Sequence, residues 1–300
     1  MSVSQLSPRI GVDELRERAA RAKELLRECR LCPRECGVDR TVGETGFCGI
    51  GELAAVASYS PHFGEEPPLV GRGGSGTIFF AGCNLGCIFC QNYDISHLRR
   101  GGEVYPEELA AVMLALQKLG CHNINFVTPT HVVPQILEAL AVARTNGLEL
   151  PLVYNCGGYE SLETIKLLDG VVDIYMPDMK YSDSSVSKAL SKAEDYWDAC
   201  RAAVKEMHSQ VGDLTMDSGG VAVSGLLVRH LVLPEGLAGT REVMRVLAEE
   251  ISIDTYVNVM DQYRPCYRAD GDERLARHIT AKEYAEALSE AREKGLHRGF

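Results

Sequence analysis

The sequence predicts an α/β fold: a partial, open TIM-like barrel of about six βα units, preceded by an N-terminal cysteine-rich extension. Two observations carry this prediction. From Gly76 onward, short apolar runs alternate with helical patterns, as expected for right-handed βαβ units around a parallel sheet. Of the 300 residues, about 225 follow that point, fewer than the roughly 250 of a complete eightfold barrel. We therefore divide the chain into an extension over residues 1–75 and a barrel over residues 76–300.

The elements follow from periodicity. Residues 12–30 are expected to be an amphipathic helix, because Leu15, Ala19, Ala22 and Leu26 recur on one face. Residues 29–51 lack periodicity, and residues 60–76 carry the Pro and Gly of a loop. The apolar runs expected to form strands are 77–81, 123–127, 152–154, 172–176, 226–233 and 255–259. The helices expected between and after them are 106–119, 132–146, 160–168, 183–210, 240–250 and 281–294.

Charge and composition exclude several classes of protein. The formal net charge is −11, which argues against a nucleic-acid partner, because such surfaces are usually basic. No run of about 18 apolar residues is present, so no membrane span is expected. The polar N-terminus has no apolar segment of the secretory type. We expect a cytoplasmic protein.

Three cysteines in one loop are the main chemical signal. Eleven cysteines are present, an odd number that disulfides alone cannot explain, and clustered thiols in a reducing compartment suggest metal ligands. Directly after the first expected barrel strand, Cys83, Cys87 and Cys90 follow a C-x3-C-x2-C spacing. Three thiolates can hold three irons of a [4Fe–4S] cluster and leave the fourth iron open to a small molecule. The alternatives are a zinc knuckle or ordinary buried cysteines.

A second group of four cysteines precedes the barrel. Cys29, Cys32, Cys36 and Cys48 suit a second [4Fe–4S] cluster or a structural zinc. The segment has no apolar run of its own, so a metal is a reasonable organiser. The alternative is four reduced thiols packed under the barrel.

The three-cysteine motif resembles the signature of the radical S-adenosylmethionine superfamily, including the aromatic Phe89 before the third cysteine. More of the chain resembles the pyruvate formate-lyase activating enzyme group, closest to its PflX-like branch. The segments that carry this resemblance are 32–40, 74–80, 83–93, 128–131 and 260–263. One departure is that no eight-cysteine, ferredoxin-like insert follows Cys90.

The resemblance implies a function. The open iron would bind S-adenosyl-L-methionine, and the reduced cluster would cleave it to a 5′-deoxyadenosyl radical that abstracts hydrogen from a protein, peptide or small-molecule substrate. Activation of a glycyl-radical enzyme is one outcome, and direct modification of a peptide or metabolite is another. A two-cluster electron-transfer protein is the alternative from a different class. An external electron donor such as flavodoxin or ferredoxin is expected.

Strand ends supply the expected cofactor contacts. After the second barrel strand come Thr128, Thr130 and His131, whose polar groups could meet an ammonium group, although Thr130 could instead cap a helix. Asn155 ends the third strand and suits ribose hydroxyls, or is a turn residue.

The fourth and fifth strands add charged candidates. Alternation puts Asp178 and Lys180 on one face, which looks like the Asp-x-Lys of activating enzymes; there it implies contact with the cofactor carboxylate and a nearby cation. A plain salt bridge is the alternative. On the fifth strand, Arg229 and His230 point to opposite sides, so at most one enters the barrel; His230 is kept as a candidate.

Overall fold

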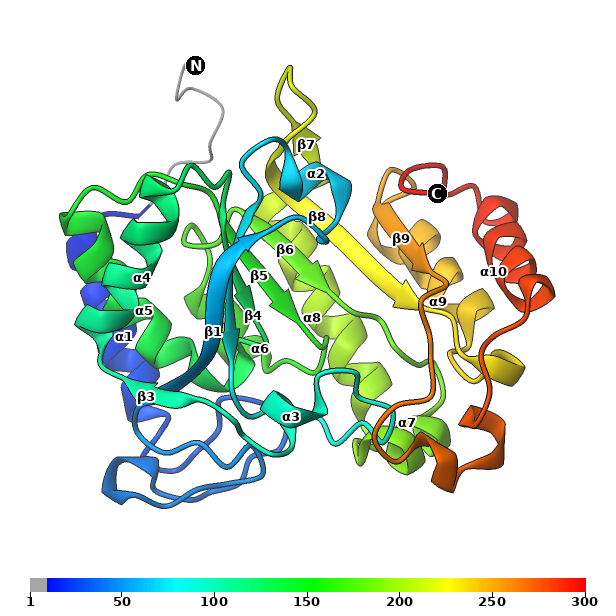
Figure 1. The fold of residues 1–300 in the computed structure, drawn as a ribbon, viewed down its shortest axis with the longest axis horizontal. Helices are drawn as coiled ribbons and strands as arrows, with labels where there is room; N and C mark the ends of the chain where they lie inside the picture. Colours follow the sequence, from blue (N-terminus) through cyan, green and yellow to red (C-terminus); the bar gives the residue numbers. More distant parts are fainter. Residues whose placement is uncertain (1–9) are drawn as a thin grey trace.

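The computed structural model describes residues 10–300, and its centre is a sheet with six parallel strands (Figure 1). Their order across the sheet is the order along the chain. They are β2 (Ser75–Phe80), β4 (Ile124–Val127), β5 (Leu152–Cys156), β6 (Ile174–Pro177), β8 (Ala222–Leu231) and β9 (Tyr256–Met260). All six correspond to predicted apolar runs, so the α/β fold and the parallel strands are confirmed.

Three short or edge strands were not predicted. β1 (Ala54–His62) runs antiparallel to β2, β3 (Gly102–Val104) pairs with β1, and β7 (Thr215–Met216) runs antiparallel to β8. β1 comes from the segment assigned to the extension, and its last residues fall in the predicted loop. Seven of the nine residues of β1 are exposed or only partly buried, so it lacks the continuous apolar run that marks a buried parallel strand. The N-terminal segment therefore contributes directly to the main sheet.

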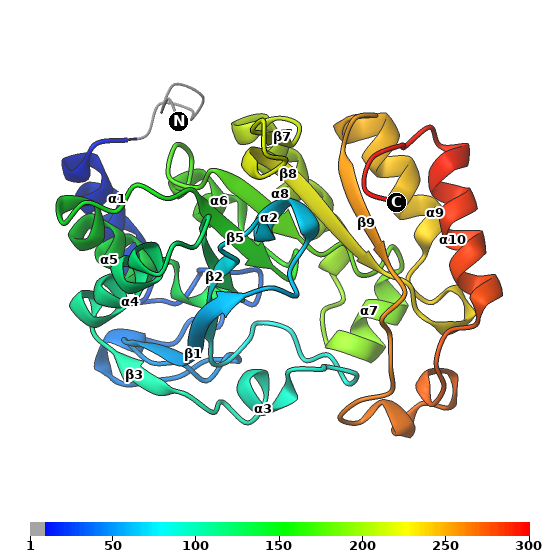
Figure 2. The same ribbon diagram turned by 45° about the horizontal axis from the view of Figure 1, so that its top comes forward.

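Helices cover the outer face of the sheet, as Figure 2 shows from a second angle. α1 (Val12–Glu24) packs on α5 (Val133–Thr145), which also packs on α4 (Pro106–Lys118). The remaining long helices are α6 (Leu162–Leu167), α7 (Ser184–Ser191), α8 (Tyr196–Val211), α9 (Thr240–Val246) and α10 (Ala281–Glu293). The predicted apolar face of the first helical segment is buried, although α1 ends at Glu24 and not at residue 30.

One predicted helix is two. The stretch 183–210 is divided into α7 and α8, because Lys192 adopts a left-handed conformation that ends α7. The predicted helix 240–250 is α9 followed by one π-helical turn, Leu247–Ile251. The division after α7 positions the end of that helix against the loop of three cysteines.

The apolar residues form two cores. The larger lies between the sheet and the helices, and a smaller one lies on the inner, concave face. In the smaller core, Leu69 of the short helix α2 (Pro67–Val70) packs with Val153, Ile174 and Leu227 of three parallel strands. Asn123 donates to the carbonyl of Leu69 at 2.9 Å and fixes α2 in place. α2 therefore fills the inner face near the amino ends of the strands.

All eleven cysteines are free thiols, so no disulfide contributes to this fold. Within residues 10–300, every helix is too short or too polar to cross a membrane.

Candidate functional site

The loop of three cysteines follows β2 and is held by backbone contacts to α7. The amides of Gly86 and Ile88 donate to the carbonyls of Ser191 and Leu190, at 3.0 and 2.9 Å. Gly82 opens the loop at a φ of +79°, and a Cβ there would lie 2.7 Å from the carbonyl oxygen of Cys48. Only glycine allows this approach of the loop to the N-terminal segment. The loop is thus clamped between α7 and the cysteine-rich extension.

Each thiol of the loop meets one polar neighbour. Ser191 Oγ donates to Cys87 Sγ at 2.9 Å, the Leu85 amide donates to Cys83 Sγ at 3.3 Å, and Cys90 Sγ lies 3.1 Å from Ser96 Oγ. Burial raises the pKa of the Cys83 and Cys87 thiols, and the proximity of the loop's other cysteines adds to the shift. These sulfurs become thiolates only with a compensating positive charge, which a metal provides.

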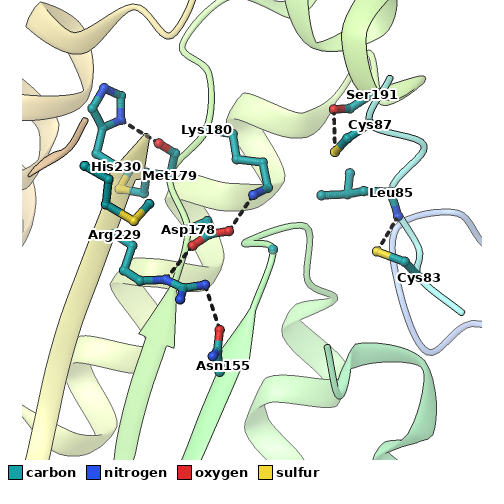
Figure 3. A network of polar contacts seen from close by, with 12 residues as sticks. Cys83, Leu85, Cys87, Asn155, Asp178, Met179, Lys180, Ser191, Arg229 and His230 are labelled. Carbon is teal, nitrogen blue, oxygen red and sulfur yellow. Dashed lines mark hydrogen bonds and ion pairs between the residues drawn. The ribbon is translucent and has the colours of Figure 1, made fainter. Parts of the chain in front are cut away.

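Asp178 joins two cations at the ends of neighbouring strands (Figure 3). Arg229 Nε donates to Asp178 Oδ1 at 2.8 Å, and Lys180 Nζ forms an ion pair with Asp178 Oδ2. Arg229 Nη2 also donates to Asn155 Oδ1 at 2.8 Å. Burial alone would raise the pKa of Asp178, but the two cations lower it below its usual value. Asp178 and Lys180 therefore meet on one face, and together with Arg229 they form a charged triad.

Lys180 lies on the side of Asp178 that faces the cysteine loop, as Figure 3 shows. Burial would lower the pKa of Lys180, but Asp178 and then Cys87 raise it, so the ammonium stays protonated. A positive group therefore faces the loop.

Thr128 is strained where β4 ends. Its φ is +60°, a left-handed conformation that is unusual for a β-branched residue. Its amide donates to the carbonyl of Asn155 at 2.9 Å, which extends the pairing of β4 with β5. Strain of this kind is concentrated at functional sites, so Thr128 indicates that the carboxyl end of β4 belongs to the candidate site.

The other predicted cofactor contacts lie elsewhere. Thr130 is fully buried and donates to Glu160 at 2.7 Å; it does not cap a helix. His131 is buried with Nε2 2.8 Å from the carbonyl of Ala81. His230 leaves β8 on the side opposite Arg229, with its ring 2.7 Å from the carbonyl of Met179 (Figure 3).

These orientations separate two groups of candidates. Asn155, Asp178 and Lys180 are brought together around Arg229. Thr130, His131 and His230 have other partners and do not join this group. Burial lowers the pKa of both histidines to about 4, which keeps the rings neutral. Phe89 is also buried and packs edge-to-face on Tyr263, with ring centroids 5.9 Å apart.

Comparison with known proteins identifies the domain that contains this site. Residues 77–217, from β2 to β7, match the family model described as the radical SAM superfamily. The chain belongs to the radical SAM superfamily. It is 33% identical over 285 residues to the uncharacterized protein MJ0674 of Methanocaldococcus jannaschii, an alignment that covers 92% of this chain and 77% of that protein.

Two further proteins are similar. The uncharacterized protein MJ0808 of the same organism is 28% identical over 204 residues, which is 59% of this chain and 56% of that protein. The crystal structure of a radical SAM methyltransferase from Sphaerobacter thermophilus superposes with a TM-score of 0.51 at 13% identity. That match covers 74% of this chain and 65% of the methyltransferase. At this low sequence identity it shows a shared fold and nothing about the reaction.

Membership of the radical SAM superfamily implies an enzyme with a [4Fe–4S] cluster and S-adenosylmethionine. The residues present fit such a cluster. Three thiols occur in one loop with no carboxylate between them, and Lys180 supplies a nearby cation. Within residues 10–300, no three His, Cys, Asp or Glu side chains are arranged around a single metal ion, whereas a cubane presents a separate iron to each thiolate.

Two of the N-terminal cysteines, Cys29 and Cys48, lie near a buried cation. Arg40 is fully buried and donates to the carbonyls of Gly51 and His131 at 2.8 Å, and its Nη1 lies 4.0 Å from Cys29 Sγ. Among the residues that the structure describes, no carboxylate pairs with it. A buried guanidinium without a counter-ion is costly. The N-terminal cysteines fit this site as thiolates, because their negative charge would compensate the Arg40 guanidinium.

Two functional candidates were missed from the sequence. Arg229 was named only as the neighbour of His230, and strand register alone decides which of the two faces inward. Glu160 has no sequence signal, yet it is buried and accepts from Thr130 and from Tyr154 OH. No motif marks either residue.

Proposed function

We propose that this chain is a radical S-adenosylmethionine enzyme, similar to activating enzymes, that takes hydrogen from a protein, peptide or small-molecule substrate. When bound, the reduced [4Fe–4S] cluster supplies the electron that cleaves S-adenosylmethionine to methionine and a 5′-deoxyadenosyl radical. The observation that carries the proposal is the position of the three-cysteine loop beside the Asp178–Lys180–Arg229 triad. The protein supplies binding, orientation and a shielded site.

The residues have distinct roles in this proposal. Cys83, Cys87 and Cys90 hold the cluster. Lys180 faces the loop and would pair with the carboxylate of the methionyl group, while Asp178 holds Lys180 in position and could accept from the ammonium. Asn155 and the Thr128 edge of the sheet would meet the nucleoside part. Their rigid placement fixes the cofactor relative to the substrate.

The substrate class has two branches. A glycyl-radical partner would place a peptide loop in the open side of the barrel. Direct modification of a peptide or metabolite is the alternative, and a polar cavity of about 400 Å³ lined by Asn155, Arg229 and Asn258 supports a small molecule. Both branches need the same cofactor site.

An acidic electron donor such as flavodoxin or ferredoxin fits the outer edge of the cysteine loop. A cavity of about 190 Å³ lies there, lined by Cys83 and by the basic residues Arg99, Lys192 and Arg268. These side chains stand out on a chain with a net charge of −11. Complementary charge raises the rate of encounter between proteins.

The N-terminal cysteines are proposed to hold a second [4Fe–4S] cluster or a zinc ion. Support comes from Arg40, whose charge is otherwise uncompensated. A second cluster would serve electron transfer toward the loop, since Gly82 brings the two cysteine segments into contact. A zinc ion would act structurally.

The test is the reductive cleavage of S-adenosylmethionine. Anaerobically reconstituted, dithionite-reduced protein should form 5′-deoxyadenosine and methionine slowly without substrate, as measured by chromatography of the quenched reaction. Replacing Cys83, Cys87 and Cys90 together with Ala should abolish the product. Cys121→Ala, a buried cysteine outside both groups, is the matched control and should retain it. Protein with a reducible cluster but no 5′-deoxyadenosine would support the electron-transfer alternative instead.

A further inference from the structure

A polar cavity of about 400 Å³ lies on the inner face of the sheet. Residues of five parallel strands line it, so it occupies the concave interior and not the outer surface. The lining residues of neighbouring strands lie opposite one another in the sheet register. Phe79 is paired with Val127, Val127 with Asn155, and Arg229 with Asn258. Its volume is in the range of small-molecule sites.

The two ends of the cavity differ. One end reaches Asn92, two residues after Cys90, so it opens toward the cysteine loop. Glu65 and Glu66, in the segment between β1 and α2, form another part of its wall, which we call the acidic end. Below them, Leu69 packs into the small inner core. The cavity therefore runs from the side of the expected radical chemistry to a pair of acidic residues.

The acidic end holds an acceptor without a donor. Glu66 is 7% exposed, and its Oε2 accepts from Asn258 Nδ2 at 2.6 Å. Glu65 Oε2 is buried and has no hydrogen-bond partner among the described residues. A buried carboxylate oxygen left unpaired is costly, and such atoms call for a missing partner.

Charge defines what that partner is. Arg229 lies close enough to both glutamates for their charges to raise its pKa, but its Nε already pairs with Asp178 and its Nη2 bonds Asn155. Two carboxylates (Glu65 and Glu66) line the cavity together with one guanidinium (Arg229), which is already paired with Asp178, and one imidazole (His62). Burial raises the pKa of Glu66, so the negative charge of this end rests mainly on Glu65, whose buried oxygen has no cationic partner among the described residues.

We propose that this cavity is the substrate site and that Glu65 and Glu66 bind a cationic nitrogen, an amine or guanidine, of a small polar substrate. This inference rests on the proposed function, because it places the other end of the substrate toward the cysteine loop. The amide of Asn258 and the guanidinium of Arg229 orient the rest of the molecule. The carboxylates select charge, and the length of the cavity selects the distance from that charge to the reacting carbon.

The experiment is anaerobic calorimetry on the reconstituted full chain, with and without saturating S-adenosylmethionine. The probes are putrescine and agmatine, with butanediol as a neutral molecule of the same length as putrescine. At least one cation should bind, and butanediol should bind at least tenfold more weakly. Binding should persist when S-adenosylmethionine is present, because the two ligands occupy different ends.

Two variants locate the site. Glu65→Gln should weaken binding of the cation at least tenfold, with an unchanged affinity for S-adenosylmethionine and no lower melting temperature, because it removes an unpaired charge. Glu103→Gln, on the exposed strand β3, is the matched control and should bind as the natural chain does. If Glu65 instead stabilises the fold through Arg229, Glu65→Gln will melt lower.

Three results would overturn the inference: no binding of either cation, equal binding by the Glu65 variant, or displacement of the cation by S-adenosylmethionine. None of these depends on cleavage of the cofactor. A chain that fails to form 5′-deoxyadenosine but binds the cation through Glu65 would contradict the proposed function alone.

Discussion

The Arg229 guanidinium donates from Nε to Asp178 at 2.8 Å and thereby joins β8 to the residue that follows β6. The backbone repeats this link, because the amide of Met179 donates to the carbonyl of Arg229 at 2.9 Å. The carboxylate of Asp178 is also the counter-ion of Lys180. One acidic group thus positions two cations, of which one faces the cysteine loop and the other lines the inner cavity.

Asp178→Asn is expected to lower both cofactor affinity and stability. A charge-assisted hydrogen bond contributes roughly 1.5–3 kcal/mol, so the affinity for S-adenosylmethionine should fall about ten- to a hundredfold. Two cations would lose their counter-ion, which should reduce the free energy of unfolding by about 3 kcal/mol. Isothermal titration and a thermal melt on the same protein measure the two effects.

The matched control is Asp198→Asn, an exposed carboxylate in the first turn of α8, which should leave the affinity unchanged and lower the free energy of unfolding by less than about 1 kcal/mol. A lower melting temperature with unchanged affinity would mean that the triad is only a salt bridge.

Iron content should separate the two cysteine groups. Anaerobic reconstitution is expected to give between about four and eight irons per chain, because one cubane holds four. Replacing Cys83, Cys87 and Cys90 with Ala should remove about half if both groups hold clusters. If the N-terminal group holds zinc, elemental analysis of the triple variant should find zinc and almost no iron. Full iron content in that variant would disprove the assignment of the loop.

Much of the barrel could be predicted because parallel strands are buried on both faces. Residues 152–154 and 226–228 are continuous apolar runs for that reason. β1 escaped prediction because Tyr59 and Ser60 are exposed on an edge of the sheet, and an exposed strand shows no such run.

Local alternation also placed Asp178 and Lys180 on one face, which the ion pair bears out. It could not choose between Arg229 and His230, since that choice depends on which side of β8 faces inward. Glu65 lies in a segment that looks like an ordinary loop. Only the folding of β1 beside β2 brings it over the inner face, a relationship between distant residues that no local pattern contains.

Glu160 should make stability depend on pH in the neutral range. Burial raises the pKa of its carboxyl from 4.5 to about 7, although Thr130 and Tyr154 donate to it. Between about pH 4.5 and 7 the folded chain holds a proton that the unfolded chain has lost, so stability falls as pH rises. This loss amounts to about 3 kcal/mol at most, at 1.36 kcal/mol for each pKa unit.

Glu160→Gln cannot lose this proton and should lack the decline. Denaturant unfolding at about pH 5 and about pH 8, on both chains in the same metal state, measures the difference. Glu163→Gln, an exposed neighbour on α6, should follow the natural chain. Parallel pH profiles for the Glu160 variant and the natural chain would refute the shift.

Arg40 is expected to govern metal retention by the N-terminal cysteines. Its guanidinium lies 4.0 Å from Cys29 Sγ and is buried without a carboxylate partner among residues 10–300. Arg40→Gln should weaken metal binding there by about 10- to 100-fold, as loss of a supporting group around a metal does. The measurement is competition with a chelator in the background that lacks the three loop cysteines. Arg30→Gln, an exposed arginine next to Cys29, should have no effect, and equal metal loss in both variants would rule out this role.

Replacing Thr128 is expected to raise the stability of the fold and to lower the affinity for S-adenosylmethionine. A left-handed conformation costs an ordinary residue roughly 1–2 kcal/mol, and glycine adopts it freely. Thr128→Gly should therefore stabilise the fold by up to about 1 kcal/mol, after the entropy that glycine loses on folding. It should also weaken S-adenosylmethionine binding, because a hydroxyl and a rigid strand end are lost together.

Glu235→Gly is the control: it relieves a similar φ of +57° beyond β8 and should stabilise the chain without changing the affinity for S-adenosylmethionine. Thr128→Asn, whose side chain is polar and tolerates this backbone region, should restore part of the binding. If Thr128→Gly binds the cofactor as well as the natural chain, the strain at this strand end has no functional purpose.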